Sequence, residues 1–329
     1  MHFVPDYQLK ILSENEFSEQ IEHIDRELDK YRISGFFNSF DGQQIFYEYF
    51  LAENSRASVV LVHGLSEFTK KYYEVTYYFL RMGYNVFLYD QRCHGFSCRL
   101  TDRIDLIHVD RFSDYADDLD TYINKIVLSA SSAPVYLYSH SMGGAVAVLY
   151  LAKHPDKVAK AILSAPMFAP TTGVAFPVAR VAMSVNAALQ QKTSKFRFSA
   201  EFNPEGNFER AMDESRSRFD RNMGMRRNDP HYQSTPMTVG WVHNSLALRA
   251  IILSPRVVGR IRTPLLLLSA GQDTVVNTEP HYRFAEKCSS CRLAVLKNAK
   301  HAMLTGTPEV IAEHLKLVFD FFGTGEVSA

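Results

Sequence analysis

The sequence of 329 residues has few cysteines, no excess of either charge and no long apolar run. Its four cysteines, Cys93, Cys98, Cys288 and Cys291, are too few for a disulfide framework in a chain of this size. Cys288 and Cys291 form one CxxC pair, but no second pair and no histidines at ligand spacing are near it, which argues against a zinc site. We therefore expect reduced thiols and no metal site.

Charge is balanced, because Lys plus Arg and Asp plus Glu each number 36. This balance leaves no electrostatic case for a nucleic-acid partner. No apolar stretch approaches the roughly 20 residues of a spanning helix, and residues 1–30 lack the basic start and apolar core of a signal peptide. We expect a soluble, cytoplasmic protein, with a peripheral position at the inner face of the membrane left open.

Apolar residues make up 46% of the chain, which is enough for a sizeable core. Short apolar segments bounded by turn residues alternate with amphipathic helical patterns. Expected strands cover residues 43–50, 58–64, 85–90, 135–138, 159–166, 264–273 and 291–296, and helical patterns between them include residues 70–83 and 112–130. This alternation predicts an α/β fold with a mainly parallel sheet covered by helices on both faces.

One interval interrupts the alternation. Residues 169–261 contain helical patches and turn residues but no comparable buried strand, so we expect a helical cap inserted into the core. The core then comprises residues 36–168 and 262–325. Residues 1–35 precede it as a helical or irregular extension to which the sequence assigns no role.

Within the expected cap, the segment PVARVAMSVNAALQ (177–190) has an apolar helical face. Three interpretations of this face remain open: it lines an acyl channel, touches a bilayer surface, or packs on the main domain. The residues of the face are Val178, Val181, Ala182, Val185 and Leu189.

The segment VYLYSHSMGGAVAVLYLAKHP, residues 135–155, joins an apolar strand to a small-residue helix at Ser141. A serine at such a sharp turn presents its hydroxyl beside the free N–H groups of the helix start, as in a nucleophile elbow. The usual signature is GxSxG, and this sequence has Ser139 in place of the first glycine. An ordinary helix-capping serine is the alternative.

Two residues that follow later strands complete a catalytic triad with Ser141. The three residues occur in the chain order of an α/β-hydrolase. Asp273 follows LLLLSAGQ and His301 follows AVLKNAK, so both lie where active-site residues of open α/β sheets collect. The sequence predicts Ser141 as nucleophile, His301 as base and Asp273 as the orienting acid. Asp90 also ends a strand and is the alternative acid, whereas we interpret His140, adjacent to Ser141, as structural with its ring directed away.

Backbone donors for an oxyanion are expected in two places. Gly64 in VHGL lets the chain approach the site, so the N–H of Leu65 pairs with that of Met142 to form the oxyanion hole. His63, Gly64 and Gly143 support the turns that carry these donors. For His63, a satisfied structural group is a more ordinary role than a catalytic base.

These motifs resemble the lysophospholipase and monoacylglycerol lipase branch of the α/β-hydrolases over roughly residues 40–320. Within that branch, the segments DESRSRFDRNMGMRRNDPHY and TVGWVHNSL of the cap are most similar to the bacterial lysophospholipase L2 enzymes. The matching segments are LVHGLSEF, YDQRCHGFS, HVDRFSDYADDL, YSHSMGG, SAGQDTVV and AKHAML. Ser139 and Cys93 depart from the family pattern, which more often has glycine at both places. The resemblance implies hydrolysis of a single acyl ester through an acyl-enzyme, with no metal and no organic cofactor.

The substrate is the least determined part of the interpretation. A lysophospholipid is expected first, with a monoacylglycerol or a general carboxylic ester as the alternative. A serine aminopeptidase would need acidic side chains for a substrate amine, and a non-catalytic binding protein would not need the three polar residues that are present. The acidic residues of the cap that could hold a substrate amine are Glu201, Glu205, Glu209, Asp213 and Glu214. Five arginines of the cap either bind the phosphate of a lysophospholipid or make the cap surface soluble: Arg210, Arg216, Arg218, Arg226 and Arg227.

Overall fold

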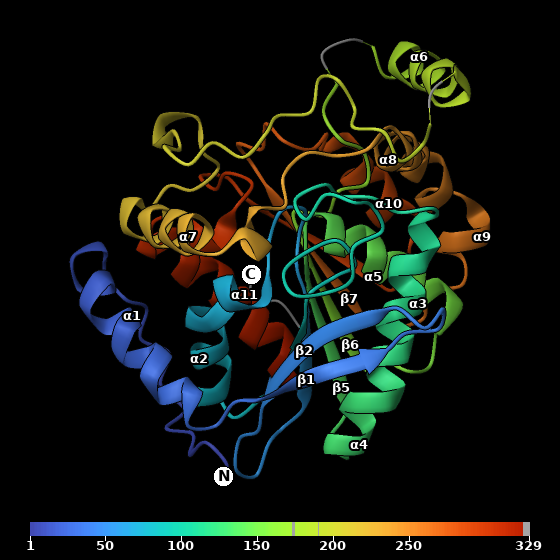
Figure 1. The fold of residues 1–329 in the computed structure, drawn as a ribbon. Coiled ribbons are helices and arrows are strands. Elements are labelled where there is room, and N and C mark those ends of the chain that lie inside the picture. The colour runs from blue at the N-terminus through green and yellow to red at the C-terminus, as the bar shows by residue number, and fades with distance from the viewer. Residues whose placement is uncertain (173–174, 190, 325–329) are drawn as a thin grey trace.

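A single sheet forms the centre of the molecule in the computed structural model, which describes residues 1–172, 175–189 and 191–324 (Figure 1). Its strands are β1 (Ile33–Asn38), β2 (Gln44–Phe50), β3 (Ser58–Val62), β4 (Asn85–Tyr89), β5 (Val135–His140), β6 (Lys160–Ser164), β7 (Leu265–Ala270) and β8 (Cys291–Leu296). They lie in the order β1-β2-β4-β3-β5-β6-β7-β8. Strand β2 is antiparallel to β1 and β4, and the remaining pairs are parallel, so the prediction of a mainly parallel sheet is confirmed.

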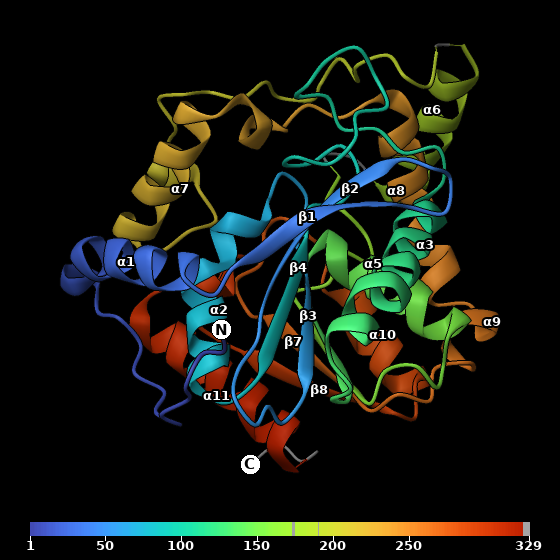
Figure 2. The ribbon, with the colours of Figure 1, turned by 60° about the horizontal axis from the view of Figure 1, so that its bottom comes forward.

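Helices cover both faces of this sheet (Figure 2). On one face lie α3 (Phe112–Tyr122), α5 (Met142–Lys153) and α10 (Glu279–Lys287), and on the other α1 (Glu14–Asp29), α2 (Tyr73–Arg81) and α11 (Pro308–Thr324). A π-helical turn, Ile123–Val127, continues α3 into α4 (Leu128–Ala130), and short 3₁₀ turns occupy Thr69–Tyr72, Phe208–Arg210, Pro230–Gln233 and Met303–Thr305.

The central strands are apolar on both sides because each side meets a helical layer. In β3, Val60 and Val62 belong to the core beneath α5, whereas Val59 and Leu61 belong to the core beneath α2. All five residues of β3 are buried. Strands of this kind appear in the sequence as continuous apolar runs, which is why they were predictable.

The N-terminal segment is regular over most of its length. Ser13 and Glu16 form a capping box at the start of α1, whose apolar side is buried. Strand β1 begins at Ile33, inside the segment expected to be helical or irregular, and was not predicted. Only Phe37 of β1 is fully buried, so this edge strand has no apolar run to mark it.

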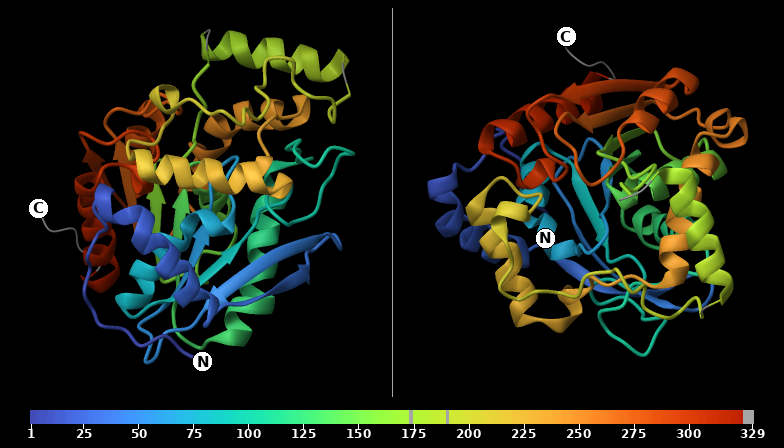
Figure 3. Two further views of the ribbon diagram at one scale, coloured as in Figure 1. Left: turned by 60° about the vertical axis from the view of Figure 1, so that its left-hand side comes forward. Right: turned by 90° about the horizontal axis from the view of Figure 1, so that it is seen from above.

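Between β6 and β7 the chain leaves the sheet and forms what we call the cap, residues 165–264. The predicted insertion, residues 169–261, lies within this segment. The described residues do not include 173–174, 190 or residue 325, at which the core was predicted to end. Seen from above, α6 and α7 lie on opposite sides of the molecule (Figure 3). The cap helices are α6 (Phe176–Leu189), α7 (Arg216–Asn228), α8 (Val239–Ile252) and α9 (Pro255–Val258).

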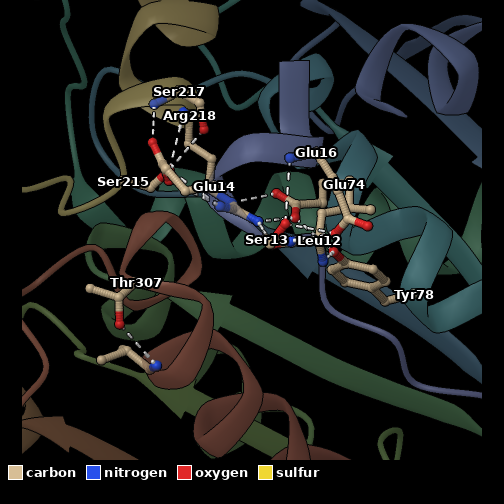
Figure 4. A network of polar contacts seen from close by, with 11 residues as sticks. Leu12, Ser13, Glu14, Glu16, Glu74, Tyr78, Ser215, Ser217, Arg218 and Thr307 are labelled. Atoms are coloured by element: carbon tan, nitrogen blue, oxygen red, sulfur yellow. Dashed lines mark hydrogen bonds and ion pairs between the residues drawn. The ribbon is translucent and has the colours of Figure 1, made fainter. Parts of the chain in front are cut away.

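Helix α7 is tied to the N-terminal helix and to α2 by a buried polar network (Figure 4). The Arg218 guanidinium donates to the Glu74 carboxylate at 2.6 and 2.9 Å and to the carbonyl of Leu12 at 3.0 Å. Glu14 accepts from the Ser215 hydroxyl at 2.6 Å, at the first turn of α7. These contacts join α7 to α1 and α2, and removal of one partner of the buried Arg218–Glu74 pair would cost about 3–5 kcal/mol because it leaves the other charge unpaired.

Candidate active site

Ser141 lies at the sharp turn between β5 and α5. Its φ of 52° and ψ of −117° put a non-glycine residue in a strained backbone conformation. Such strain is typical of a nucleophile elbow, where the turn pushes the side chain out of the sheet. The strand and the helix therefore present the Ser141 hydroxyl at the carboxyl end of the sheet.

The residues around the elbow must be small. A Cβ on Gly143 would lie 2.1 Å from the carbonyl oxygen of Val62, so only glycine fits where α5 starts against β3. At the first position of the signature, the Ser139 hydroxyl donates to the carbonyl of Ile162 in β6 at 2.8 Å. This hydrogen bond satisfies the buried hydroxyl and shows how a serine is accommodated at the place of the usual glycine.

The three predicted side chains meet at the strand ends. His301 Nε2 lies 2.8 Å from the Ser141 hydroxyl oxygen, and His301 Nδ1 lies 2.7 Å from Asp273 Oδ2. Since Asp273 is an acceptor, Nδ1 carries a proton and Nε2 is free to accept the hydroxyl proton of Ser141. This geometry is that of a base-activated serine.

Of the two carboxylates considered, Asp273 is the one bonded to His301. Burial raises the pKa of Asp273, but its hydrogen bond to His301 and those from the N–H groups of Val275 and Val276 outweigh burial and lower it. Asp90 instead accepts from the backbone N–H groups of Thr69 and Phe96 at 2.7 and 2.9 Å. Its carboxylate organises loops rather than the histidine.

The proposed oxyanion donors are two backbone N–H groups near Ser141: Met142 follows it in the chain, and Leu65 lines the same cavity. Met142 is the first residue of α5, so its N–H has no intrahelical acceptor, and no acceptor is found for the N–H of Leu65 among the described residues. His63 accepts from the N–H of Gln91 at 2.9 Å and therefore donates from Nδ1 to the carbonyl of Gly64 at 2.7 Å. These contacts give His63 a supporting place in the turn, and burial lowers its pKa.

The sequence matches a known protein family over most of its length. A model described as "Serine aminopeptidase, S33" matches residues 53–308. The chain belongs to this family. The predicted α/β-hydrolase fold and the predicted resemblance to its lysophospholipase and monoacylglycerol lipase branch are both confirmed.

Similar S33 proteins include lipid hydrolases. Lysophospholipase L2 of Escherichia coli is 29% identical over 299 residues, covering 87% of this chain and 86% of that protein. Monoglyceride lipase of Rattus norvegicus is 26% identical over 273 residues, covering 82% and 84%. Among solved structures, a soluble variant of the Saccharomyces cerevisiae monoglyceride lipase has a TM-score of 0.73 at 17% identity, covering 91% of this chain and 97% of that one. At that identity the structural likeness supports the fold alone.

Beside the elbow of this S33 protein lies a charged cluster that the sequence analysis missed. The buried Glu67 carboxylate accepts from Lys71 Nζ at 2.7 Å, from the Tyr72 hydroxyl at 2.6 Å and from the N–H of Gly64 at 2.6 Å. Burial raises the pKa of Glu67, but the Lys71 ammonium and these hydrogen bonds outweigh it and hold the pKa far below its usual range. Glu67 precedes the 3₁₀ turn Thr69–Tyr72 that contains Lys71, so no helical spacing in the sequence marked this ion pair.

We expected His140 to be a structural residue with its ring directed away from Ser141, and in the structure its side chain lies beside His301 and Glu67. Its ring lies 5.1 Å from that of His301, centroid to centroid, and its Nε2 lies 3.9 Å from Glu67 Oε1. Burial lowers its pKa to about 4, so His140 is neutral at neutral pH. Its ring thus forms part of the site wall, although no hydrogen bond joins it to Ser141 among the described residues.

A cavity of about 410 Å³ opens at Ser141 and His301 beneath the cap. Cap residues line it on the side away from the sheet. Its apolar lining includes Met167, Phe202, Met212, Phe219 and Met223. A second cavity, of about 30 Å³, lies under α7 and has room for little more than water. Of these two cavities, the one of about 410 Å³ combines the serine with space for a substrate.

The apolar face of α6 has no part in this cavity. The helix packs on α8 through Ala179, Met183 and Ala187, and its other face is turned to solvent. The exposed fractions are 59% for Val178, 67% for Val181, 55% for Val185 and 80% for Leu189. The interpretations in which this face lines an acyl channel or packs on the main domain are therefore wrong.

Metal-binding side chains do not cluster in the described part of the chain, where no group of three or more His, Cys, Asp or Glu is arranged to hold an ion. All four cysteines are free thiols. Among residues 1–172, 175–189 and 191–324, no helix has the length and apolarity required to cross a membrane.

Proposed function

We propose that the chain hydrolyses single-chain lipid esters, lysophospholipids first among them, through an acyl-enzyme formed on Ser141. The observation that carries this proposal is the position of His301, which is bonded to both Ser141 and Asp273 at the mouth of the 410 Å³ cavity. The names of the S33 relatives, lysophospholipase L2 and monoglyceride lipase, support a lipid ester as substrate.

The chemistry proceeds in two halves. Ser141 attacks the ester carbonyl while His301 Nε2 takes its proton, and His301 then returns that proton to the leaving alcohol. Water next attacks the acyl-enzyme, with His301 again accepting the proton and passing it to Ser141. Asp273 keeps the histidine in the required tautomer and stabilises the imidazolium.

Charge on the carbonyl oxygen is stabilised by the N–H groups of Leu65 and Met142. Each preorganised donor of this kind contributes about 3–4 kcal/mol to lowering the barrier. Glu67 supports the first donor indirectly, because its carboxylate binds the N–H of the preceding residue, Gly64. The loop is thus held in place before substrate arrives.

Acyl-chain length tests the lipid assignment. We expect kcat/KM for a series of soluble esters to rise about tenfold for every two carbons until the cavity is full, because each buried CH₂ contributes about 0.8 kcal/mol. The measurement uses matched esters below their micellar thresholds. A flat series would point to a small-ester pocket and contradict the lipid assignment.

A serine aminopeptidase is the second candidate, favoured by the family description and by acidic residues in the cavity. Two of the three carboxylates that line the cavity are neutralised, because Glu67 is paired with Lys71 and Glu201 with Arg103 and Lys195, which leaves Asp213 as the acidic group for a substrate amine. Turnover of aminoacyl amides without turnover of lipid esters would favour the peptidase.

We also propose that α6 touches the membrane surface, which would place the protein peripherally at the inner face of the membrane. The exposed valines and Leu189 form an apolar face on a helix whose one charged residue is Arg180. Phe198, 75% exposed, adds an aromatic side chain in the cap. Apolar side chains of this kind insert into the interfacial region of a bilayer.

The double change Val181→Asp and Val185→Asp is expected to lower co-sedimentation with phospholipid vesicles severalfold, because charge opposes insertion. Hydrolysis of a short soluble ester should remain as in the wild type. Leu128→Asp is the matched control, since Leu128 is 52% exposed in α4, at the far end of the molecule from α6 (Figure 1). Equal vesicle binding by both variants would contradict membrane contact through α6.

A further inference from the structure

The cap side of the Ser141 cavity contains hydrogen-bond acceptors without donors. Asp213 Oδ1 and Asn222 Oδ1 are buried, and neither has a hydrogen-bond partner in the described part of the chain. Both residues line the same cavity as Ser141 and His301. Because buried polar atoms are nearly always paired in folded proteins, two unpaired acceptors on residues of the cavity wall indicate donors from outside the chain, either water or a ligand.

A cation lies on the same wall. Arg226 lines the cavity, donating from Nε to the carbonyl of Tyr232 at 3.1 Å and from Nη2 to the Thr235 hydroxyl, with its guanidinium 4.6 Å from the centre of the Phe202 ring. Burial lowers its pKa to about 10, so it keeps its charge at neutral pH. These contacts fix the guanidinium at the cavity wall.

The other cap arginines considered for a phosphate are committed elsewhere or exposed. Arg218 is bonded to Glu74, Arg216 to Asp220 and Arg227 to the carbonyl of Pro204. Arg210 is exposed and does not line the cavity. Among these five cap arginines, Arg226 alone lines the cavity of Ser141.

We propose that Asp213, Asn222 and Arg226 form a head-group subsite for the leaving alcohol of a lysophospholipid. Arg226 binds the phosphate, and the two acceptors bind N–H or O–H donors beyond it. This inference rests on the proposed lipid-ester function and adds the head group to it. A primary ammonium supplies the donors, whereas a quaternary choline has none and would leave Asp213 Oδ1 and Asn222 Oδ1 unpaired.

The subsite is held in place before the substrate binds. Asn222 and Arg226 are one turn apart on α7, and α7 is fixed by the Arg218–Glu74 pair and by Glu14 (Figure 4). The N-terminal helix, to which the sequence assigned no role, thus positions one wall of the cavity. Preorganised groups of this kind discriminate between ligands because they do not rearrange to suit the wrong one.

The experiment compares lysophosphatidylethanolamine, lysophosphatidylcholine and a monoacylglycerol of one chain length, below their micellar thresholds. We expect the wild type to prefer the ethanolamine lipid over the choline lipid by about tenfold or more in kcat/KM, because the latter leaves buried acceptors unpaired. Asn222→Leu and Asp213→Asn should each bring this ratio towards one. Arg226→Met should lower the preference for both phospholipids over the monoacylglycerol.

Matched controls are Asn228→Leu and Asp220→Asn, which change the same residue types on α7 outside the cavity and should keep the wild-type ratios. Equal kcat/KM for the ethanolamine and choline lipids in the wild type would overturn the subsite while leaving ester hydrolysis intact. Ratios that shift equally in the control variants would overturn it as well. Turnover of none of the three lipids, with a short ester still cleaved, would overturn the proposed lipid function itself.

Discussion

Replacement of Ser141 by alanine is expected to lower kcat for a short chromogenic ester by about 10⁵- to 10⁶-fold while the protein stays folded. The hydroxyl that bonds His301 at 2.8 Å is the attacking group in the proposed mechanism, so its removal leaves only the oxyanion donors and binding. Labelling by a fluorophosphonate probe, located by mass spectrometry, should disappear together with activity.

Ser139→Ala is the matched control, because Ser139 lies two residues away and its hydroxyl is bonded to the carbonyl of Ile162 rather than to a histidine. This variant should keep activity within a few-fold of the wild type and should still be labelled at Ser141. Probe attachment to another serine in the wild type, or full activity of Ser141→Ala, would show that the nucleophile is misassigned.

Asp273→Asn is expected to lower kcat by about 10⁴-fold with little change in KM. An asparagine keeps the size of the side chain but offers an N–H to His301 Nδ1, which favours the tautomer that cannot accept the Ser141 proton. Burst and steady-state kinetics of ester hydrolysis measure this loss, and a thermal melt checks that the variant is folded.

Asp90→Asn provides the comparison for this effect. Asp90 accepts two backbone N–H groups and is not bonded to His301, so its amide variant should lose stability rather than turnover per folded molecule. The assignment of Asp273 fails if the folded fraction of Asp90→Asn turns over ester more slowly than that of Asp273→Asn.

The sheet was predictable because its central strands are buried on both sides. Runs such as SVVLV and LLLLSA need no partner to be recognised, since continuous apolar segments between turn residues have few other uses in a chain of this composition. Strand β1 was not predicted because it lies at the sheet edge and is largely exposed, so its residues form no apolar run. Only its pairing with β2 in the folded structure identifies it as a strand.

The sequence alone also determined which side chains to bring together as a candidate site. Ser141, Asp273 and His301 each follow a strand, and the carboxyl ends of parallel strands meet at one edge of a sheet. Local pattern and chain order are therefore sufficient to nominate them. The sharp turn at Ser141 was also predictable, because it requires small residues near it in the chain, such as Ser139 and Gly143.

Only the tertiary structure decided what surrounds those residues. The position of His140 between Glu67 and His301, the outward direction of the apolar face of α6, and the unpaired acceptors of Asp213 and Asn222 all depend on how segments far apart in the chain pack. The apolar pattern of α6 predicts a buried face but does not say which element covers it. In the structure α8 packs on a different side of α6, which contains Ala179, Met183 and Ala187. Hydrophobic periodicity can be read from one segment of the sequence. The packing partner of a helix depends on a second segment, whose position is known only in the folded chain.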